Sequence, residues 1–454
     1  MRYFAYWLVL VLLSLGRTAL ADPQPDSRGP APNPAQGESY DGRPPHRSAG
    51  DVALDVPRAL LLPFRLILWA AEPPTREGVE SFERHHVYQH LYYTFTSEDG
   101  EVGLRPTFAW MRFFRPSFGA HVFDDRLLGP GTQFNVDIAG GVDVVHAAAH
   151  ARPTHIGRRV QLHLDTVFDR RNDFLFTGLG ASAPLRSDHP SARYQANVLD
   201  VGTRLDLASH QMVAFSFGGF FGLRRFANGE DYSGIAPIEQ VYCTRVDGAC
   251  VPGTVNGALV PGFLNGTQFV RTSAALHVDL RDHLVRPTLG LLIDAEADYS
   301  HGLGSDDSDY FRIRGAMSVV LPLWGGHSHV LVLRGVTRLV LPIGDAPVPF
   351  FELPALGGPD DLRGFRWQEF RDFSSLIATA EYRWPLLVWA DAALFVDYGG
   401  VFGRNYQNFG AAQMQPDVGL GIRLHTRDRF YVRLQVAYGF GNSWQVYLSG
   451  QNLP

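Results

Sequence analysis

The sequence predicts an all-β fold, a transmembrane antiparallel β-barrel of about 16 strands that follows an N-terminal helical segment. Three observations predict it: an export signal, strands of about ten residues in which apolar and polar side chains alternate, and aromatic residues near the strand ends. The 454-residue chain has a mean hydropathy of −0.07. A helical membrane protein is excluded, because it needs repeated apolar runs of about 20 residues.

The first 21 residues have the pattern of a secretory signal peptide. Arg2 supplies the positive start, residues 8–15 form a short apolar core, and Ala-Leu-Ala at 19–21 is a small-residue cleavage site. The alternative, an inner-membrane anchor, needs a longer apolar core than this segment has. We therefore expect export, with cleavage near Ala21.

The next two segments are expected to precede the barrel. Residues 22–55 are rich in Pro, Gly, Ser and charge, which predicts a disordered linker. Residues 56–100 begin with an apolar stretch that basic residues interrupt, and this pattern favours either a periplasmic amphipathic helical segment or a plain packing helix. His86 and His90 have metal-binding spacing, but they lack a third ligand, so no metal or other cofactor is predicted.

Period-two alternation begins near Leu104 and continues towards the C-terminus. In residues 270–281, one face carries Val, Thr, Ala, Leu, Val and Leu, and the other carries Arg, Ser, Ala, His, Asp and Arg. A soluble sandwich also alternates, but long strands and ionisable groups on the minor face favour a barrel with a wet lumen. Residues 101–454 are therefore predicted to form the barrel.

The candidate strands number roughly sixteen, an even number, as single-chain bacterial barrels prefer. Their expected starts are Leu104, Phe118, Gln133, Asp143, Arg159, Ala192, Gln211, Phe269, Arg286, Tyr310, His329, Ser375, Asp391, Gln415, Tyr431 and Trp444. The alternative for residues 142–150 is that they belong to the neighbouring candidate strand and form no strand of their own. The aromatic residues expected near the membrane interfaces are Tyr382, Trp384, Trp389, Tyr398 and Trp444.

Two long loops follow odd-numbered candidate strands. Residues 227–262 carry Cys243 and Cys250, the two cysteines of the chain, and after export they are expected to form a local disulfide, with two free thiols as the alternative. Two cysteines are too few for a disulfide scaffold or a zinc ribbon. The formal net charge of −6 argues against a nucleic-acid partner.

The second long loop, residues 342–371, carries the most specific motif, Leu-Gly-Gly-Pro-Asp-Asp-Leu-Arg-Gly-Phe-Arg-Trp at 356–367. Alternation places Glu381 on the inner face of the next candidate strand and Asp397 on the inner face of the strand after it. A guanidinium inside a barrel costs several kcal/mol unless carboxylates pair with it.

This motif resembles the signature loop of the Omp85 superfamily, the BamA/TamA-type barrels with a bacterial surface antigen D15 domain. The resemblance implies that Arg363, Gly364 and Phe365 form a loop tip that folds back into the lumen and is locked by Glu381 and Asp397. Family members usually carry POTRA modules before the barrel. The stretch before the first candidate strand has no room for one, so a POTRA-less member is predicted. The terminal aromatic residue usual in such barrels is also missing.

The resemblance implies assembly, insertion or translocation of proteins at the outer membrane, through a seam between the strands near Leu104 and Trp444. The implied partners are outer-membrane lipid or lipopolysaccharide and nascent outer-membrane or secreted proteins, with the barrel as a monomer. A gated or plugged pore for small solutes or lipid is the alternative, which inward residues such as Arg271, Arg423 and Arg433 would also suit. No enzyme is expected, because neither Gly-x-Ser-x-Gly nor His-Glu-x-x-His occurs.

Overall fold

The computed structural model describes residues 95–450, apart from residues 98, 100, 128–131, 153–159, 181–190, 211, 284–285, 305–307, 324–328, 388–389, 426–429 and 441–442. The described residues all lie in the second of two compact units, residues 86–454. The predicted signal peptide, the linker, the helical segment up to residue 94 with its two histidines, and Trp389 lie outside the described residues.

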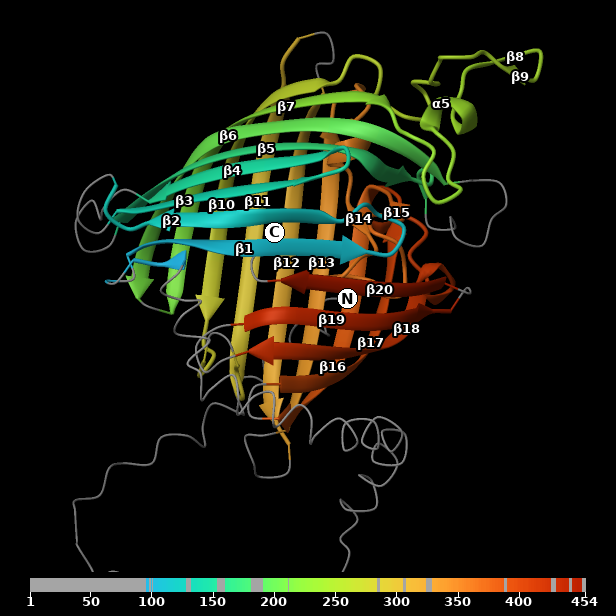
Figure 1. Cartoon of the computed structure of the whole chain (residues 1–454). Coiled ribbons are helices and arrows are strands. Elements are labelled where there is room, and N and C mark those ends of the chain that lie inside the picture. Colours follow the sequence, from blue (N-terminus) through green and yellow to red (C-terminus); the bar gives the residue numbers. More distant parts are fainter. Residues whose placement is uncertain are drawn as a thin grey trace, which may run out of the picture. The chain divides into compact units, whose positions relative to one another are not determined.

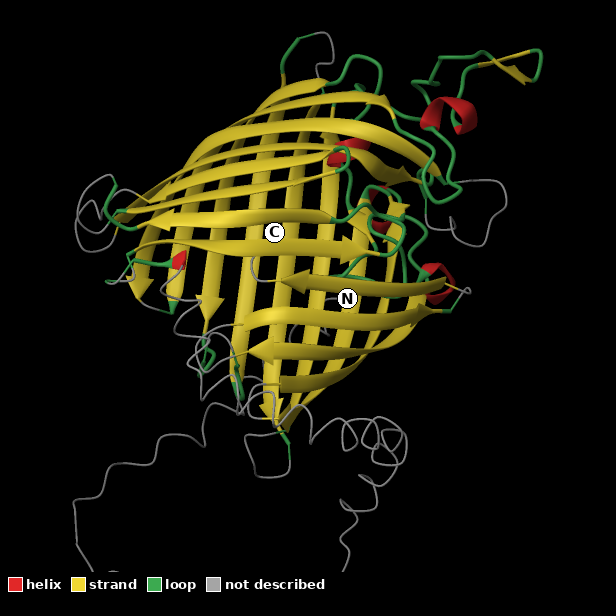
Figure 2. Ribbon diagram, in the orientation of Figure 1, coloured by secondary structure: helices red, strands yellow, loops and turns green. Residues whose placement is uncertain are grey.

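Sixteen of the described strands form one closed antiparallel barrel, in which each strand pairs with its neighbours along the chain (Figures 1 and 2). They are β1 (Val102–Met111), β2 (Ser117–Asp124), β3 (Gln133–Gly141), β4 (Val144–Arg152), β5 (Val160–Phe176), β6 (Ala192–His210), β7 (Val213–Asn228), β10 (Thr267–Asp279), β11 (Gly290–Gly302), β12 (Asp309–Pro322), β13 (Val330–Ile343), β16 (Ser374–Leu387), β17 (Ala390–Phe402), β18 (Gln415–His425), β19 (Phe430–Gly439) and β20 (Ser443–Gly450).

The remaining elements lie in loops. Two small hairpins are β8 (Arg245–Val246) with β9 (Ala249–Cys250), and β14 (Ala355–Leu356) with β15 (Phe370–Arg371). The short helices are α5 (Ile238–Val241), η2 (Phe350–Glu352), η3 (Arg404–Tyr406) and η4 (Ala411–Gln413). Among the helices of the described residues, none is long and apolar enough to cross a membrane.

The predicted all-β barrel and its strand count are confirmed. The predicted and observed strand starts differ most at Arg286, because β11 begins at Gly290. Residues 144–152 form a strand of their own, β4, and do not belong to β3. Alternation located the strands well because a barrel wall has one face towards lipid and the other towards the lumen along its whole circumference.

The outer face of the barrel is apolar. Large side chains there are strongly exposed in the protein alone: Phe118 is 66% exposed, Ile138 is 54% and Phe217 is 52%. Their neighbours in sequence point to the lumen, as alternation requires. Near one end of the wall, Tyr382 stacks on Trp384, with ring centroids 5.1 Å apart. An apolar band with aromatic residues at its edge is the surface that a bilayer requires.

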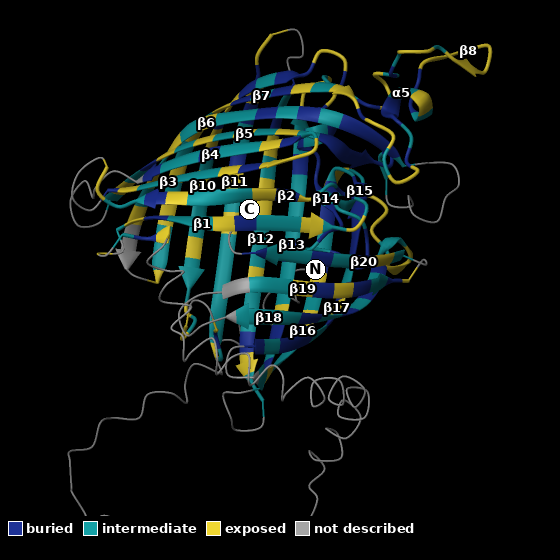
Figure 3. Cartoon of the chain, in the orientation of Figure 1, coloured by how far each residue is buried: buried dark blue, intermediate teal, exposed yellow. Residues whose placement is uncertain are grey.

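The strands β5, β6 and β7 are longer than the predicted length of about ten residues, with 17, 19 and 16 residues. The last five residues of β5 are all buried, whereas the rest of the strand alternates. Figure 3 shows this change towards the end of β5 and β6 that approaches the long loops. We call this end of the barrel, which carries the loops 229–266 and 344–373, the loop end.

A hydrophobic cluster fills the loop end of the barrel. It joins Phe174 and Tyr194 of the wall to Ile238 and Phe263 of the loop 229–266, and it includes Phe350 of the loop 344–373. Burial of these side chains explains why β5 and β6 extend so far, because their inner faces there support loops and not solvent. The sequence predicted two long loops but not that they share one core.

The two cysteines lie in the loop 229–266, beyond α5. Their Sγ atoms are bonded to each other, and the Cα atoms are 5.5 Å apart. The bond closes the small hairpin of β8 and β9, whose residues are exposed. This hairpin lies at the edge of Figure 1 beside α5.

Candidate functional site: the plug loop and the barrel seam

Residues 344–373, which connect β13 to β16, fold into the barrel lumen, and we call them the plug loop. Ala355 pairs with Arg371, and this short hairpin closes the base of the loop. The loop buries Leu356, Leu362 and Phe370, which cluster with side chains of β13, β16 and β17. The plug loop therefore has its own apolar contacts with the wall, in addition to its charged ones.

Arg363 lies at the inner tip of the plug loop and is 5% exposed. Its Nε and Nη2 atoms donate to both carboxylate oxygens of Asp397, at 2.8 and 2.9 Å. Its Nη1 atom donates to Glu381 at 2.6 Å. The guanidinium thus makes a bidentate bond to β17 and a second charged bond to β16, the geometry that best compensates a buried positive charge.

The surroundings of this ion pair are also charged or aromatic. Arg363 lies over the ring of Phe395, with 3.3 Å from Cζ to the ring centroid. Glu381 accepts further bonds from Arg383 and Arg423, at 2.6 and 2.8 Å. Thr379 donates to Asp397 at 2.7 Å. Each carboxylate therefore has several hydrogen-bond donors, which offset the cost of its burial.

Two contacts of the tip were not predicted from the sequence. The backbone N–H of Gly364 donates to Asp417 of β18 at 2.9 Å. The hydroxyl of Tyr447 on β20 donates to the backbone carbonyl of Phe365 at 2.7 Å. Alternation could have placed Asp417 inward with Gly419, but no sequence signal marks Tyr447 as a partner of the plug loop.

The seam between β1 and β20 is short. In the described residues, Ala109, Trp110 and Met111 are the residues of β1 that pair with β20, opposite Ser449, Leu448 and Tyr447. The ladders on either side are longer, with eight residue pairs for β1 with β2 and eight for β19 with β20. Leu104 and Trp444, the expected starts of the seam strands, lie on β1 and β20 but do not pair with each other.

The plug loop contacts both sides of this seam. Tyr447, which holds the plug tip, is the partner of Met111 across the seam. On the other side, Trp367 of the plug loop packs edge-on against Phe114, in the turn between β1 and β2, with centroids 5.7 Å apart. Displacement of the plug loop would therefore remove support from β20 and from the turn that follows β1.

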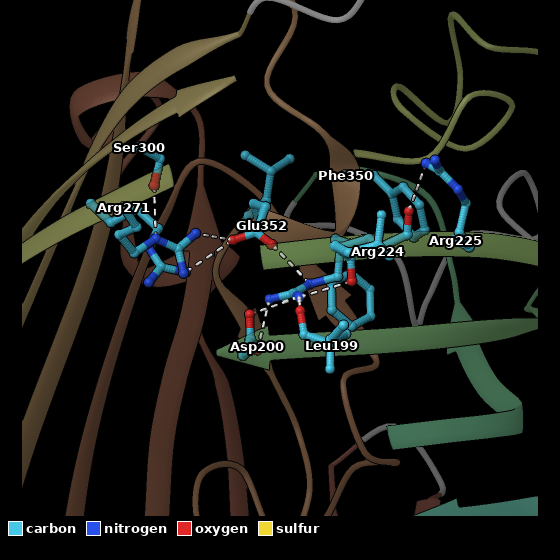
Figure 4. A network of polar contacts seen from close by, with 12 residues as sticks. Leu199, Asp200, Arg224, Arg225, Arg271, Ser300, Phe350 and Glu352 are labelled. Atoms are coloured by element: carbon cyan, nitrogen blue, oxygen red, sulfur yellow. Dashed lines mark hydrogen bonds and ion pairs between the residues drawn. The ribbon is translucent and has the colours of Figure 1, made fainter. Parts of the chain in front are cut away.

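A second polar network holds the base of the plug loop, and Figure 4 shows it. Glu352 of η2 is 6% exposed and contacts three arginines of the wall. Arg271 Nη2 lies 2.6 Å from its Oε2, Arg312 Nη1 lies 3.0 Å from its Oε2, and Arg224 Nε lies 3.3 Å from its Oε1. These arginines belong to β10, β12 and β7, so one carboxylate connects the plug loop to three strands.

The charge state of Glu352 follows from its neighbours. Burial alone would raise the pKa of Glu352, but the positive charges of Arg271, Arg224 and Arg312 outweigh burial and lower this pKa to about 2. Arg371 of the plug loop fixes the backbone around it by donating to the carbonyls of Phe350 and Phe351, at 2.9 and 3.0 Å. Glu352 is therefore a carboxylate at every physiological pH.

This pKa predicts how the stability contributed by Glu352 depends on pH. Because the folded pKa lies below the ordinary value of 4.5, the contribution is complete above about pH 4.5 and is lost as the pH falls through about 2. We expect the difference in thermal midpoint between the wild type and Glu352→Gln to shrink across this window. A difference that stays constant down to pH 2 would contradict the assignment.

Two cavities lie beside the plug loop inside the barrel. The larger, of about 590 Å³, is lined by Met111 and Tyr447 at the seam and by Trp367 of the plug loop. The smaller, of about 390 Å³, is lined by Arg312, Glu352 and other residues of β11 to β13. Within the described residues, no cluster of three or more His, Cys, Asp or Glu side chains has a metal-binding arrangement.

A closed antiparallel barrel with an apolar outer surface and a charged lumen filled by a loop is an integral membrane barrel, of the kind that spans bacterial outer membranes. Residues 266–447, from β10 to β20, match the Omp85 superfamily domain. This domain match agrees with the resemblance of the Leu-Arg-Gly-Phe motif, and the barrel fold indicates a location in the outer membrane.

Two of the solved structures that are similar to this chain are BamA and CdiB. BamA from Haemophilus ducreyi, in a crystal structure without POTRA domains 1–3, has a TM-score of 0.56 and 14% identity, over 77% of this chain and 70% of that one. CdiB from Acinetobacter baumannii has a TM-score of 0.48 and 12% identity, over 77% and 59% of the two chains. The BamA match shows a shared fold. No curated protein matches the sequence.

Proposed function

We propose that this barrel inserts or translocates proteins at the outer membrane by opening between β1 and β20, with the plug loop controlling the opening. The observation that carries the proposal is the short seam, in which the described pairing of β1 with β20 is limited to Ala109, Trp110 and Met111. A seam with few hydrogen bonds can open and accept a strand from another chain, because the separated backbone N–H and C=O groups can then extend the sheet.

The structure of the plug supports the same proposal. An edge left open inside a bilayer is costly, since no water satisfies its backbone groups, so such a seam needs a device that keeps it closed at rest. The contacts of Tyr447 with Phe365 and of Phe114 with Trp367 connect the plug loop to β20 and to the turn that follows β1. Release of the plug would then weaken the seam and expose the β1 edge to a client strand.

The test is a disulfide across the seam. Ala109 and Ser449 are paired residues of β1 and β20, and the double variant Ala109→Cys/Ser449→Cys is expected to close the seam when oxidised. We would reconstitute the barrel in liposomes, add an unfolded eight-stranded outer-membrane barrel as client, and measure its protease-resistant folded fraction. Oxidation is expected to abolish the stimulation of client folding, and reduction is expected to restore it.

The matched control is Ala437→Cys/Gln445→Cys, which cross-links the paired strands β19 and β20 away from the seam. This variant is expected to remain active in both redox states. If the seam cross-link leaves client folding unchanged, the opening between β1 and β20 is not the route.

The plugged pore is the second candidate, and the two cavities beside the plug loop favour it. It predicts that a variant with a loosened plug loop, such as Glu352→Gln, conducts ions in planar bilayers, and that the oxidised seam variant conducts as well as the reduced one. The insertase proposal makes no demand on conductance but requires the seam to open. Client folding and ion conductance, both measured on the seam variant in its oxidised and reduced states, therefore distinguish the candidates.

A further inference from the structure

The three arginines around Glu352 form a site that the wall builds without the plug loop. Arg224 makes a bidentate bond to Asp200, at 2.9 and 3.0 Å. The Oδ1 atom of Asp298 lies 2.9 Å from Arg271 Nε and accepts a hydrogen bond from Arg312 Nε, also at 2.9 Å. These partners belong to β6, β7, β10, β11 and β12, so the guanidinium groups are oriented by the barrel wall itself.

The wall residues of this site carry a net positive charge that one anion can neutralise. Without Glu352, three guanidinium groups face two carboxylates, which gives the wall residues one net positive charge. Glu352 neutralises that charge, and its carboxylate contacts all three arginines within 3.3 Å. Planar guanidinium groups that converge on one point match the geometry of a carboxylate.

The carboxylate that occupies this site belongs to the plug loop and not to the barrel wall. Glu352 lies in η2 of the plug loop, and Arg371 of the same loop holds the backbone of that turn. The cavity of about 390 Å³ borders both Glu352 and Arg312, so a small solute in the lumen can reach the site. The site is thus open to a ligand from the lumen whenever the glutamate side chain is absent.

We infer that Arg224, Arg271 and Arg312 form a carboxylate-binding site in the lumen, and that Glu352 is its tethered ligand. The plug loop is then held by two charged contacts of opposite polarity. At its tip the loop brings an arginine to wall carboxylates, and at its base it brings a carboxylate to wall arginines. The second contact is exchangeable, because another carboxylate of suitable size fits the same place.

Chemical rescue tests this site in the purified full-length barrel, without any client. Glu352→Ala is expected to lower the thermal midpoint of the barrel and to expose the plug loop to protease, since it leaves three arginines without their shared partner. Acetate is expected to raise the midpoint of this variant in a concentration-dependent manner, because it binds the vacated site in the folded state alone. Sodium chloride at equal ionic strength is expected to give no such rise.

Two variants serve as controls. Arg363→Ala also loosens the plug loop but leaves the carboxylate site filled, so acetate should not rescue it. Glu352→Ala/Arg271→Ala removes part of the site and should also show no rescue. Failure of acetate to stabilise Glu352→Ala beyond sodium chloride, or equal rescue of Arg363→Ala, would overturn the proposal. Rescue by inorganic phosphate as strong as that by acetate would overturn the assignment of a carboxylate as the ligand.

Discussion

Replacing Arg363 by Ala is expected to release the tip of the plug loop and to lower the free energy of unfolding by about 3–5 kcal/mol. The substitution leaves the fully buried Asp397 with Thr379 as its remaining side-chain donor, while Glu381 keeps two arginines. An uncompensated buried carboxylate is the main cost. Two measurements report the effect. One is the thermal midpoint, from the change in gel mobility when the barrel unfolds on heating, and the other is the rate of protease cleavage within residues 344–373.

The control for this prediction is Arg433→Ala. Arg433 also contacts the plug loop, at Asp360, but the side chain of Asp360 is 64% exposed. A solvated pair of this kind contributes about 1 kcal/mol or less, so the control should change the midpoint little. If both variants behaved alike, the contact of Arg363 with the wall would be no more than a surface ion pair.

Replacing Gly364 by Ala is expected to displace the same tip without any change in charge. A Cβ at this position would lie 2.5 Å from the Cβ of Asp417 and 2.5 Å from the backbone nitrogen of Gly439. Neither atom can move easily, because both belong to paired wall strands. The tip must therefore retract, which strains the bonds of Arg363 and costs about 1–3 kcal/mol. Protease cleavage of the plug loop should increase although Arg363 is intact.

Gly335→Ala on β13 is the matched control, because a Cβ there meets no atom within 4 Å. It should leave both the midpoint and the cleavage rate unchanged. An equal effect of the two substitutions would show that the barrel tolerates alanine poorly in general, and would remove the argument for a tight fit at Gly364.

Alternation explains why the wall could be predicted from the sequence. The alternation within a strand shows which of its side chains face lipid and which face the lumen. The inward position of Asp397 therefore follows from its neighbours Val396 and Tyr398, without knowledge of any contact. Once the motif at Arg363 was taken to fold inward, its two partners could be chosen among the inward carboxylates of the next strands. The role of this cluster as a lock stays a prediction until the variants are measured.

The contacts of Glu352 could not be found in this way. Its partners lie on β7, β10 and β12, up to 128 positions away in the chain at Arg224, and the lumen offers many other arginines. Alternation says which side chains point inward but not which of them meet. One local signal existed: Glu352 is the single charged residue between Pro347 and Pro354, and an acid within such an apolar run is a candidate for a buried ion pair.

The seam shows a third limit of the sequence. The extent of pairing between β1 and β20 depends on the stagger of the strands around the barrel, which is a property of the closed sheet and not of either strand alone. The pattern located both strands correctly, yet the pairing of Met111 with Tyr447 follows only from closure.

The distribution of plug contacts around the wall has a mechanical consequence. Through Phe351 and Trp367 the plug loop meets Phe174 on β5, through Glu352 it meets β7, β10 and β12, and its tip meets β16, β17, β18 and β20. It is therefore a transverse brace that fixes the cross-section of the tube. The lateral pressure of the lipid acts on any barrel. Because the wall is weakly bonded between β1 and β20, the barrel keeps its circumference only while the plug loop is in place.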